Sequence, residues 1–469
     1  MDKNSVYNAL PYPLQVLAAS VRGLNLRGWR YGSDTEKIIE ETSTRETWTT
    51  KQWKQWQEEQ MAFILHRAAR HVPYYRDYWQ KQRQIGNKAS SEYLGNWPLL
   101  KKEIVRNHPE AFVADDVNLK SLFLDHTGGT SGRPTLIYES RTTILQWYAI
   151  FEARVRRWHQ VSYKEKWGMF GGQKIVPLTQ KKPPFWVRNY GLNQLYFSIF
   201  HITKDTAKYY VDALNQFSPT HLIAYPSALS VLAFYILDLG LVPPKLRVIF
   251  TNSEKVITKQ KKLIQDAFNC PVIDTYGMAE LTSAGSECKV GTLHYWPESG
   301  FMEIFDKSEN KCHKNNNRLG EFVMTSIINK DMPLIRYLNG DIGSLPIWDY
   351  GCPCGRNLPK FGSINGRQND LITTADGRRL YLLDSLFNGL PLIEAQLIQE
   401  SLNSFIVFIV PGEGFDLNTV SKKIEVTLNE YLGPIHTDIQ IVTDIPRNQN
   451  GKFQPFISRL GNEEFLENC

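Results

Sequence analysis

The segment Thr127–Gly132, within HTGGTSGRP, has the residue types that bind phosphate. Its glycines leave backbone N–H groups accessible, and its hydroxyls add further hydrogen-bond donors. The spacing fits neither a P-loop, which needs Gly-Lys-Ser/Thr after four intervening residues, nor a Gly-x-Gly-x-x-Gly dinucleotide fingerprint. Taken alone, the loop is equally explained by an ordinary turn between a strand and a helix. The candidate phosphate contacts are Thr127, Gly128, Gly129, Thr130, Ser131 and Gly132.

Four more polar, glycine-containing segments follow predicted strands later in the chain. They are DTYGMAE (274–280), IRYLNGDIG (335–343), INGRQND (364–370) and PRNQNGKFQ (446–454). Each combines a turn glycine with a charged side chain, which is a weak signal in isolation. Together, in this order, they indicate one composite nucleotide site.

Alternating elements must position these segments. Residues 1–115 are mostly helical by periodicity, and apolar runs ending in turns then alternate with helices, which is typical of a parallel α/β sheet. After about residue 290, strands separated by turns predict an antiparallel, barrel-like section. From about residue 370, SFIVFIV, a helix near 420–431 and DIQIVTDIP predict a compact unit of about 100 residues.

Composition excludes several classes of protein. The 469-residue chain is 42% hydrophobic and 12% aromatic, so it can bury a large core. A net charge of +6 without a dense basic stripe argues against nucleic acid as a partner. Six cysteines in this length indicate a reducing compartment, so we expect a cytoplasmic protein. The partly apolar amino terminus is compatible with peripheral membrane contact.

The ordered motifs resemble those of the adenylate-forming (acyl-CoA synthetase-like) superfamily. Within it, LPYPLQVLAASVRGLNLRGWRYG and AARHVPYYRDYW resemble the phenylacetate–CoA ligase branch and its CapK-like members in capsule biosynthesis. The resemblance implies a large adenylation domain, here residues 1–367, and a small mobile α+β domain, residues 368–469. It also implies that a carboxylate attacks the α-phosphate of ATP, giving acyl-AMP and pyrophosphate, before a thiol or amine takes the acyl group.

The same resemblance implies a role for each motif. Thr127–Gly132 would hold the leaving pyrophosphate, and Tyr276 would stack on adenine beside the loop of Asn252, Ser253 and Glu254. Asp341 would bind the ribose hydroxyls, and Arg367 the ribose or phosphate. Glu280 would bind Mg²⁺, and Lys452 would be the catalytic lysine. The nucleotide-binding residues also include Asp274 and Gly277.

Two positions depart from the family pattern. Arg133 stands before Pro134, so the loop lacks the usual lysine, and Asn369 occupies the place of the usual hinge aspartate. Asparagine tolerates the backbone changes of a hinge, so we expect domain rotation to survive.

A cysteine pair and two distant ligands form a candidate zinc site. Cys352 and Cys354 are one residue apart, and ECKVGTLH supplies Cys288 and His294. Three thiolates and one imidazole complete a tetrahedral, structural zinc shell, whereas unligated buried thiols are the alternative. Similar positions occur in some phenylacetate–CoA ligase relatives.

Two classes of function remain open. The first is a ligase that uses ATP and Mg²⁺ to activate a small carboxylic acid, with coenzyme A, an amine or a carrier as acceptor, in surface-polysaccharide biosynthesis or in aryl or acyl acid metabolism. The second is a non-catalytic adenylate-binding relative. The acid pocket is expected to be lined by residues between about 170 and 230 and by those after Tyr276, with Tyr196, Phe197 and His201 in a partly aromatic wall.

Overall fold

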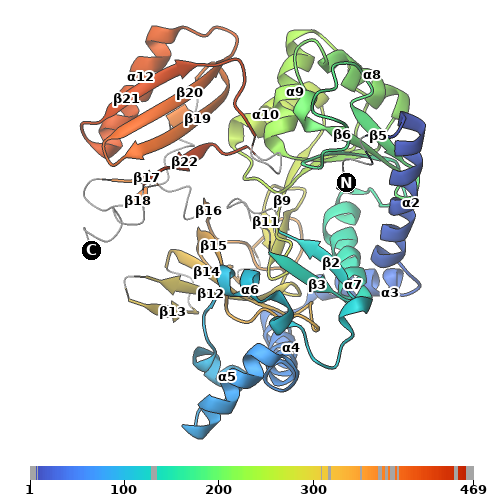
Figure 1. The fold of residues 1–469 in the computed structure, drawn as a ribbon, viewed down its shortest axis with the longest axis vertical. Helices are drawn as coiled ribbons and strands as arrows, with labels where there is room; N and C mark the ends of the chain where they lie inside the picture. The colour runs from blue at the N-terminus through green and yellow to red at the C-terminus, as the bar shows by residue number, and fades with distance from the viewer. Residues whose placement is uncertain are drawn as a thin grey trace.

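The fold combines three larger sheets with helices in a mixed α/β architecture, as predicted (Figure 1). The computed structural model describes residues 7, 9–127, 135–307, 309–314, 318–348, 351–367, 372–374, 379–380, 386–387, 390–447 and 453–460. The candidate residues Gly128, Gly129, Thr130, Ser131, Gly132 and Lys452, together with Asn369, lie outside these ranges.

An eight-stranded sheet forms the centre of the large domain, with strand order β11-β10-β9-β8-β7-β4-β6-β5. The five strands from β9 to β6 in this order are parallel, and the flanking strands are antiparallel to their neighbours. The predicted parallel sheet is therefore present. Its strands are β4 (Trp167–Gly171), β5 (Trp186–Asn189), β6 (Gln194–Ser198), β7 (His221–Ala224), β8 (Val248–Thr251), β9 (Val272–Gly277), β10 (Ala284–Glu287) and β11 (Leu293–Tyr295).

Side chains alternate between the two faces of this sheet. Leu222 and Ile249 pack in one core with α8 (Ala207–Phe217), α9 (Pro226–Asp238) and α10 (Thr258–Phe268). Ile223 and Phe250 point to the other face, toward α7 (Arg141–Phe151) and the π-helical turn Glu152–Arg156 that continues it. Because both faces of the sheet are covered and successive side chains alternate between them, the strands are continuous apolar runs in the sequence. The apolar helix α9 is buried, as predicted.

The amino-terminal part is helical, as predicted. The long helix α2 (Tyr12–Arg30) packs against β5 and α7 at the right-hand edge of the molecule (Figure 1). Thr49 caps α4, because its hydroxyl accepts from Gln52 N and its own N–H donates to the Gln52 side chain. The other helices here are α3 (Thr35–Thr44), α4 (Thr50–His71), α5 (Pro73–Gln84) and α6 (Lys102–Asn107).

A six-stranded, largely antiparallel sheet follows, consistent with the turn-rich strands after residue 290. Its order is β1-β15-β14-β12-β13, with β16 paired to β15. Its strands are β1 (Leu100–Lys101), β12 (Gly300–Asp306), β13 (Lys311–His313), β14 (Gly320–Ser326), β15 (Tyr337–Gly343) and β16 (Ile364–Arg367).

The glycine-rich loop joins two strands, so the interpretation as a turn between a strand and a helix is wrong. β2 (Phe123–His126) and β3 (Leu136–Glu139) form an antiparallel pair. Thr127 N donates to Thr135 O and Thr135 N donates to Thr127 Oγ1, each at 3.0 Å. The loop is thus flanked on both sides by a closed pair of strands, and the strand after it, Leu136–Glu139, is only four residues long.

The carboxy-terminal part has its own core. The order of its four-stranded sheet is β21-β20-β19-β22, and one cluster of buried residues, including Phe405, Ile424 and Phe456, is confined to residues 372–456. The domain boundary after residue 367 stays a prediction. The elements are β17 (Ile372–Thr373), β18 (Arg379–Leu380), β19 (Leu392–Ser401), β20 (Ser404–Pro411), α12 (Leu417–Leu432), β21 (His436–Ile441) and β22 (Phe456–Ser458).

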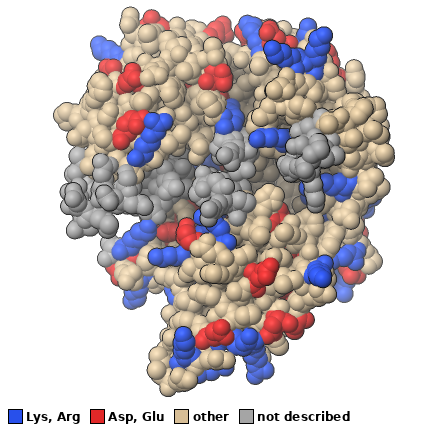
Figure 2. Space-filling model, viewed as in Figure 1, with Lys and Arg blue, Asp and Glu red and all other residues tan. Residues whose placement is uncertain are grey.

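Charges of both signs are interspersed over the face shown in Figure 2. Lysine and arginine side chains lie beside aspartate and glutamate rather than in one basic stripe. This distribution agrees with the modest net charge of +6.

Candidate functional site

One cavity of about 1590 Å³ collects most of the predicted site residues. Its nucleotide end is formed where the parallel strands end, which is the usual place for a ligand in an open α/β sheet. Residues separated by more than 200 positions in the chain therefore share one wall. The predicted residues that line it are Thr127, Asn252, Ser253, Glu254, Asp274, Tyr276, Gly277, Glu280 and Asp341.

The loop after β8 has an unusual backbone. Ser253 has φ of +68°, a conformation that non-glycine residues seldom adopt and that is often found at functional sites. Its neighbours Asn252 and Glu254 face the same cavity. A short polar turn at a strand end, held in this conformation, can present backbone hydrogen-bonding groups to the edge of a planar aromatic ligand.

Asp274 lies at the end of β9 beside a second acid. Burial raises its pKa to about 7, and the nearby Glu287 carboxylate adds to that increase, while a hydrogen bond from Thr251 Oγ1 at 2.9 Å opposes it. Asp274 N donates to Glu287 Oε2 at 2.8 Å. Because Lys261 also pairs with Glu287, the second carboxylate is balanced and Asp274 is the group that can bind or release a proton near neutral pH.

Tyr276 and Asp341 are linked directly. Tyr276 Oη donates to Asp341 Oδ2 at 2.6 Å, and Asn339 Nδ2 donates to the same oxygen at 2.7 Å. The Tyr276 ring meets Phe361 edge-on, with centroids 5.2 Å apart. Arg367 pairs with Asp341 across the β15–β16 ladder, so its backbone lies beside the cavity. This network fixes the aromatic face and the carboxylate relative to each other.

Glu280 has a partner that the sequence did not indicate. Its Oε1 accepts from Tyr337 Oη at 2.8 Å and lies 3.3 Å from Lys102 Nζ, and its side chain is 5% exposed. Lys102 also lines the cavity, although it is 178 residues away in the chain. It begins α6 within the run KKE, which reads as an ordinary solvated helix start. Only the fold brings this ammonium group to the predicted magnesium ligand.

The small domain reaches the cavity through the end of the PRNQNGKFQ segment. Phe453 N donates to Glu254 Oε1 at 2.8 Å, and Ser227 N donates to Glu254 Oε2 at 3.1 Å. Glu254 therefore connects α9 of the large domain with the residue that follows Lys452 in the chain. Burial raises the pKa of Glu254, and these two N–H donors favour its charged form.

The wall of the acid pocket differs in part from the expectation. Tyr196 lines the cavity, whereas Phe197 is buried in the opposite core, because adjacent strand residues point to opposite faces. His201 bonds Ser198 and stacks on Phe185, away from the cavity lining. The actual wall also includes Trp147 and Phe151 of α7, which lie before the range predicted from the sequence.

Cys288, His294, Cys352 and Cys354 converge in a second site. Cys288 Sγ and Cys352 Sγ are 3.9 Å apart, and Cys354 Sγ is 3.4 Å from His294 Nε2. A tetrahedron with Zn–S bonds of about 2.3 Å and Zn–N bonds of about 2.0 Å has edges of roughly 3.4 to 3.8 Å. All four ligand atoms lie within 4.8 Å of one another, so the arrangement fits a tetrahedral metal ion.

The histidine of this cluster is oriented by a backbone carbonyl. Its Nδ1 lies 3.1 Å from Leu358 O, so Nδ1 carries the proton and Nε2 offers its lone pair toward Cys354. Burial lowers the pKa of His294, which favours the neutral ring. A carbonyl behind the imidazole is the usual support of a metal-ligating histidine.

Comparisons with known proteins agree with this architecture. The family model of the CapK C-terminal domain matches residues 372–459. Protein CapK of Staphylococcus aureus is 27% identical over 461 residues, covering 96% of this chain and 98% of that protein. Phenylacetate-coenzyme A ligase of Pseudomonas putida is 24% identical over 345 residues, covering 70% and 73% of the two chains. The structure of 2-hydroxyisobutyryl-CoA ligase with R3-HIB-AMP in the postadenylation state has a TM-score of 0.67 at 19% identity and covers 90% and 92%.

These likenesses place the chain among the adenylate-forming enzymes. Within that class the findings support a CapK-like family, in agreement with the motifs.

Proposed function

We propose that this protein activates a carboxylic acid with ATP as an acyl- or aminoacyl-adenylate and passes the acyl group to a thiol or amine acceptor. The observation that carries the proposal is the single cavity that joins the polar ends of β8, β9 and β15 with the small-domain residue Phe453. Such a cavity has room for both a nucleotide and an acid. The full-length likeness to CapK supports a role in surface-polysaccharide biosynthesis.

The residues of this chain have separate tasks in the proposed reaction. The loop 252–254 and the ring of Tyr276 bind adenine, and Asp341 accepts hydrogen bonds from the ribose hydroxyls. The acid carboxylate attacks the α-phosphate, and Lys452 stabilises the charge that moves to the bridging oxygen. The N–H groups and hydroxyls of Thr127–Gly132 stabilise the departing pyrophosphate.

Two metal ions belong to this proposal. Glu280 offers a buried carboxylate in the cavity that fits Mg²⁺, which would neutralise charge on the ATP phosphates. Cys288, His294, Cys352 and Cys354 fit a structural Zn²⁺, since all four positions would be filled by protein.

The acceptor separates two versions of the reaction. Coenzyme A would give a thioester, as the names of the phenylacetate-coenzyme A ligases indicate for those relatives, whereas an amine or carrier would give a polysaccharide building block. The first half-reaction is the same in both cases, so adenylate formation is the step to test.

The test is ATP–pyrophosphate exchange with a panel of carboxylic acids, with the acyl-AMP identified by mass spectrometry. We expect at least one acid to support exchange, and Asp341→Ala to raise the KM for ATP by about ten- to a hundredfold through loss of the ribose hydrogen bonds. Asp212→Ala, an exposed aspartate of α8, is the matched control. ATP binding without exchange for any acid would instead identify a non-catalytic adenylate-binding relative.

We also propose that α2 rests on a membrane surface. No helix in the described ranges has both the length and the apolarity to cross a bilayer. However, Leu14, Leu17, Val21 and Leu24 lie on one face of α2 and are 46% to 61% exposed. Residues 12–30 include three arginines and no acidic residue. This exposed apolar face favours a lipid surface, whereas Arg22, Arg27 and Arg30 line the cavity or its side pocket on another face of α2.

Co-sedimentation with vesicles tests this contact. We expect binding to phospholipid vesicles, and about tenfold weaker binding after Leu17→Glu with Leu24→Glu. Leu119→Glu, at an exposed leucine outside α2, should bind as the unmodified chain does. A dimer in solution that the α2 changes dissociate would show that a second copy covers this face instead.

A further inference from the structure

The end of the cavity away from the nucleotide is lined with arginines. Ala18, Arg22, Leu26 and Arg30 follow one another at intervals of four residues on α2, and all four line the cavity. This spacing places them on one face of the helix. Arg156 lines the same region from the π-helical turn after α7. Two elements far apart in the chain therefore contribute three arginines to the lining of one cavity, and Arg30 and Arg156 also share the lining of a side pocket.

The sheet shows how far this region lies from the nucleotide. Trp167 and Met169 of β4 lie on the cavity face, and the nucleotide loops follow the carboxyl ends of the parallel neighbours of β4. Trp167 is the first residue of β4, so it lies at the opposite end of the strand, about 13 Å away for four residues at 3.3 Å each. The cavity thus runs along the sheet face, with aromatic walls between its two ends.

Arg156 is buried but incompletely satisfied. It is 3% exposed, and its Nη1 donates to Tyr31 Oη at 3.2 Å and to Glu152 Oε2 at 3.3 Å. Its Nε has no hydrogen-bond partner in the part of the chain that the structure describes. An unpaired buried N–H is costly, so this guanidinium is suited to an additional acceptor.

The counter-charges for these arginines are few. Glu152 is shared between Arg156 and Arg157, and neither Arg22 nor Arg30 forms an ion pair with a carboxylate of the described residues. Arg30 lies over the Tyr148 ring at 4.4 Å. Two of the acids that line the cavity, Glu139 and Asp125, lie near Arg30: burial raises the pKa of Glu139 to about 8, which leaves it largely neutral at pH 7, and Asp125 lies on the β2–β3 hairpin. Positive charge therefore exceeds negative charge in this region.

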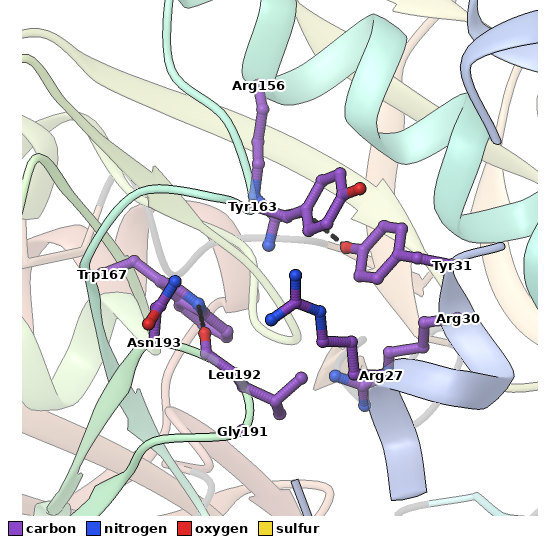
Figure 3. A pocket seen from close by; sticks show the side chains of 9 residues that line it. All are labelled: Arg27, Arg30, Tyr31, Arg156, Tyr163, Trp167, Gly191, Leu192 and Asn193. Carbon is purple, nitrogen blue, oxygen red and sulfur yellow. Dashed lines mark hydrogen bonds between the residues drawn. The ribbon is translucent and has the colours of Figure 1, made fainter. Parts of the chain in front are cut away.

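A small side pocket extends the arginine region. Its lining shares Arg30, Arg156, Trp167 and Leu192 with the large cavity, and its volume of about 10 Å³ suits one water-sized group. Figure 3 shows Arg27 and Arg30 reaching into this region from α2, and Arg156 from the other side. The arrangement offers planar N–H donors from several directions, which is the way that guanidinium groups bind carboxylate or phosphate oxygens.

We propose that the acid activated in this cavity carries a second anionic group, a carboxylate or a phosphate, which Arg22, Arg30 and Arg156 bind at the end remote from the nucleotide. This inference rests on the proposed ligase function. The aromatic walls formed by Trp147 and Trp167 would hold the part of the acid between its two charged ends. The second charge would select the substrate, because without an anion the buried Arg156 is left with an unpaired donor and the positive charge of Arg22 and Arg30 is not balanced.

Matched pairs of acids test the proposal by ATP–pyrophosphate exchange. The pairs are adipate with hexanoate, terephthalate with benzoate, and glucuronic acid 1-phosphate with glucuronic acid. We expect the acid with the second anion to have a kcat/KM at least about tenfold higher in at least one pair. Preference in the first two pairs would indicate a carboxylate, and preference in the third a phosphate.

Arginine variants then locate the binding site. Arg30→Gln and Arg22→Gln should each raise the KM for the preferred dianionic acid by about ten- to a hundredfold, with kcat and the KM for ATP nearly unchanged. The KM for the matched monoanionic acid should change little. Arg83→Gln, at an exposed arginine of α5 outside the cavity, is the control.

The outcomes separate this inference from the proposed function. If monoanionic acids support exchange as well as their dianionic partners do, or if the arginine variants affect both members of a pair equally, the second-anion inference is wrong and the ligase function stands. If no acid supports exchange, the proposed function fails and the inference fails with it.

Discussion

Replacement of Lys452 by alanine should lower the rate of adenylate formation by about 10²- to 10³-fold, which is the usual loss when one preorganised donor to a developing charge is removed. The α-phosphate gains negative charge as the carboxylate attacks, and a compact ammonium group can follow that charge. Lys452→Arg should restore little, because a planar guanidinium is larger and differently shaped. Initial rates of ATP–pyrophosphate exchange measure the effect.

The position of the small domain supports this expectation. Phe453, which follows Lys452, donates its N–H to Glu254 Oε1 at the nucleotide end of the cavity. Lys259 of α10 also donates to the Leu392 carbonyl of the small domain at 2.9 Å. These contacts place Phe453 and Gln454, the last two residues of the PRNQNGKFQ motif, at the cavity wall.

The two half-reactions provide the control for Lys452. Transfer of the acyl group from a preformed acyl-AMP should change by less than about threefold, since the charge on the bridging oxygen is no longer developing. Lys422→Ala, at an exposed lysine of α12 in the same domain, should leave both steps intact. An equal loss in both half-reactions would mean that Lys452 supports the fold of the small domain rather than adenylation.

Elements with strong periodicity were predictable, and contacts across the fold were not. The strands β7, β8 and β9 read as apolar runs because both faces of the sheet are covered, and helix α9 followed a proline turn as expected. Nothing in the sequence indicated that Lys102 and the arginines of α2 line the cavity. Arginines eight positions apart are also typical of a solvated helix face, and only packing of α2 against β5 and α7 turns this face to the cavity.

The acid pocket illustrates the same limit at the level of single residues. Tyr196 and Phe197 are adjacent in one strand, so at most one can face the cavity, and the pattern around them did not reveal which. For the cysteines, the sequence supplied the ligand types but left the pairing open. Only the fold shows that the β10–β11 turn and the segment around Cys352 come together.

Loss of the zinc cluster should destabilise the protein and weaken its binding of ATP. Cys288 and His294 flank the β10–β11 turn, whereas Cys352 and Cys354 belong to the segment that leads to Phe361. A metal ion bound by all four would tie these two segments together, as structural zinc does in small domains. Cys352→Ser should therefore lower the unfolding midpoint by about 5–10 °C and reduce bound zinc from about one per chain to near zero.

We expect Cys352→Ser also to weaken nucleotide binding, because Phe361 packs against Tyr276. This residue meets Tyr276 at 5.2 Å and Tyr295 at 5.3 Å, and its backbone N–H donates to Leu293 O at 2.9 Å. If the metal clamp is lost, Phe361 supports the Tyr276 ring less firmly, and the KM for ATP should rise about three- to tenfold while the KM for the acid changes little. Elemental analysis, thermal unfolding and exchange kinetics of one preparation measure the three effects together.

A substitution at a cysteine outside the cluster distinguishes the effect of losing the metal from the effect of losing ordinary packing contacts. Cys312 of β13 is not among the four ligands, so Cys312→Ser should keep its zinc and its unfolding midpoint. Dialysis of the unmodified protein against a chelator should reproduce the midpoint of Cys352→Ser, and added Zn²⁺ should restore the original midpoint only in the unmodified protein. The zinc hypothesis is wrong if the purified protein contains no zinc and the chelator leaves its stability unchanged. In that case the three cysteines are reduced thiols beside His294, and the hydrogen bonds among the four residues suffice to hold the two segments together.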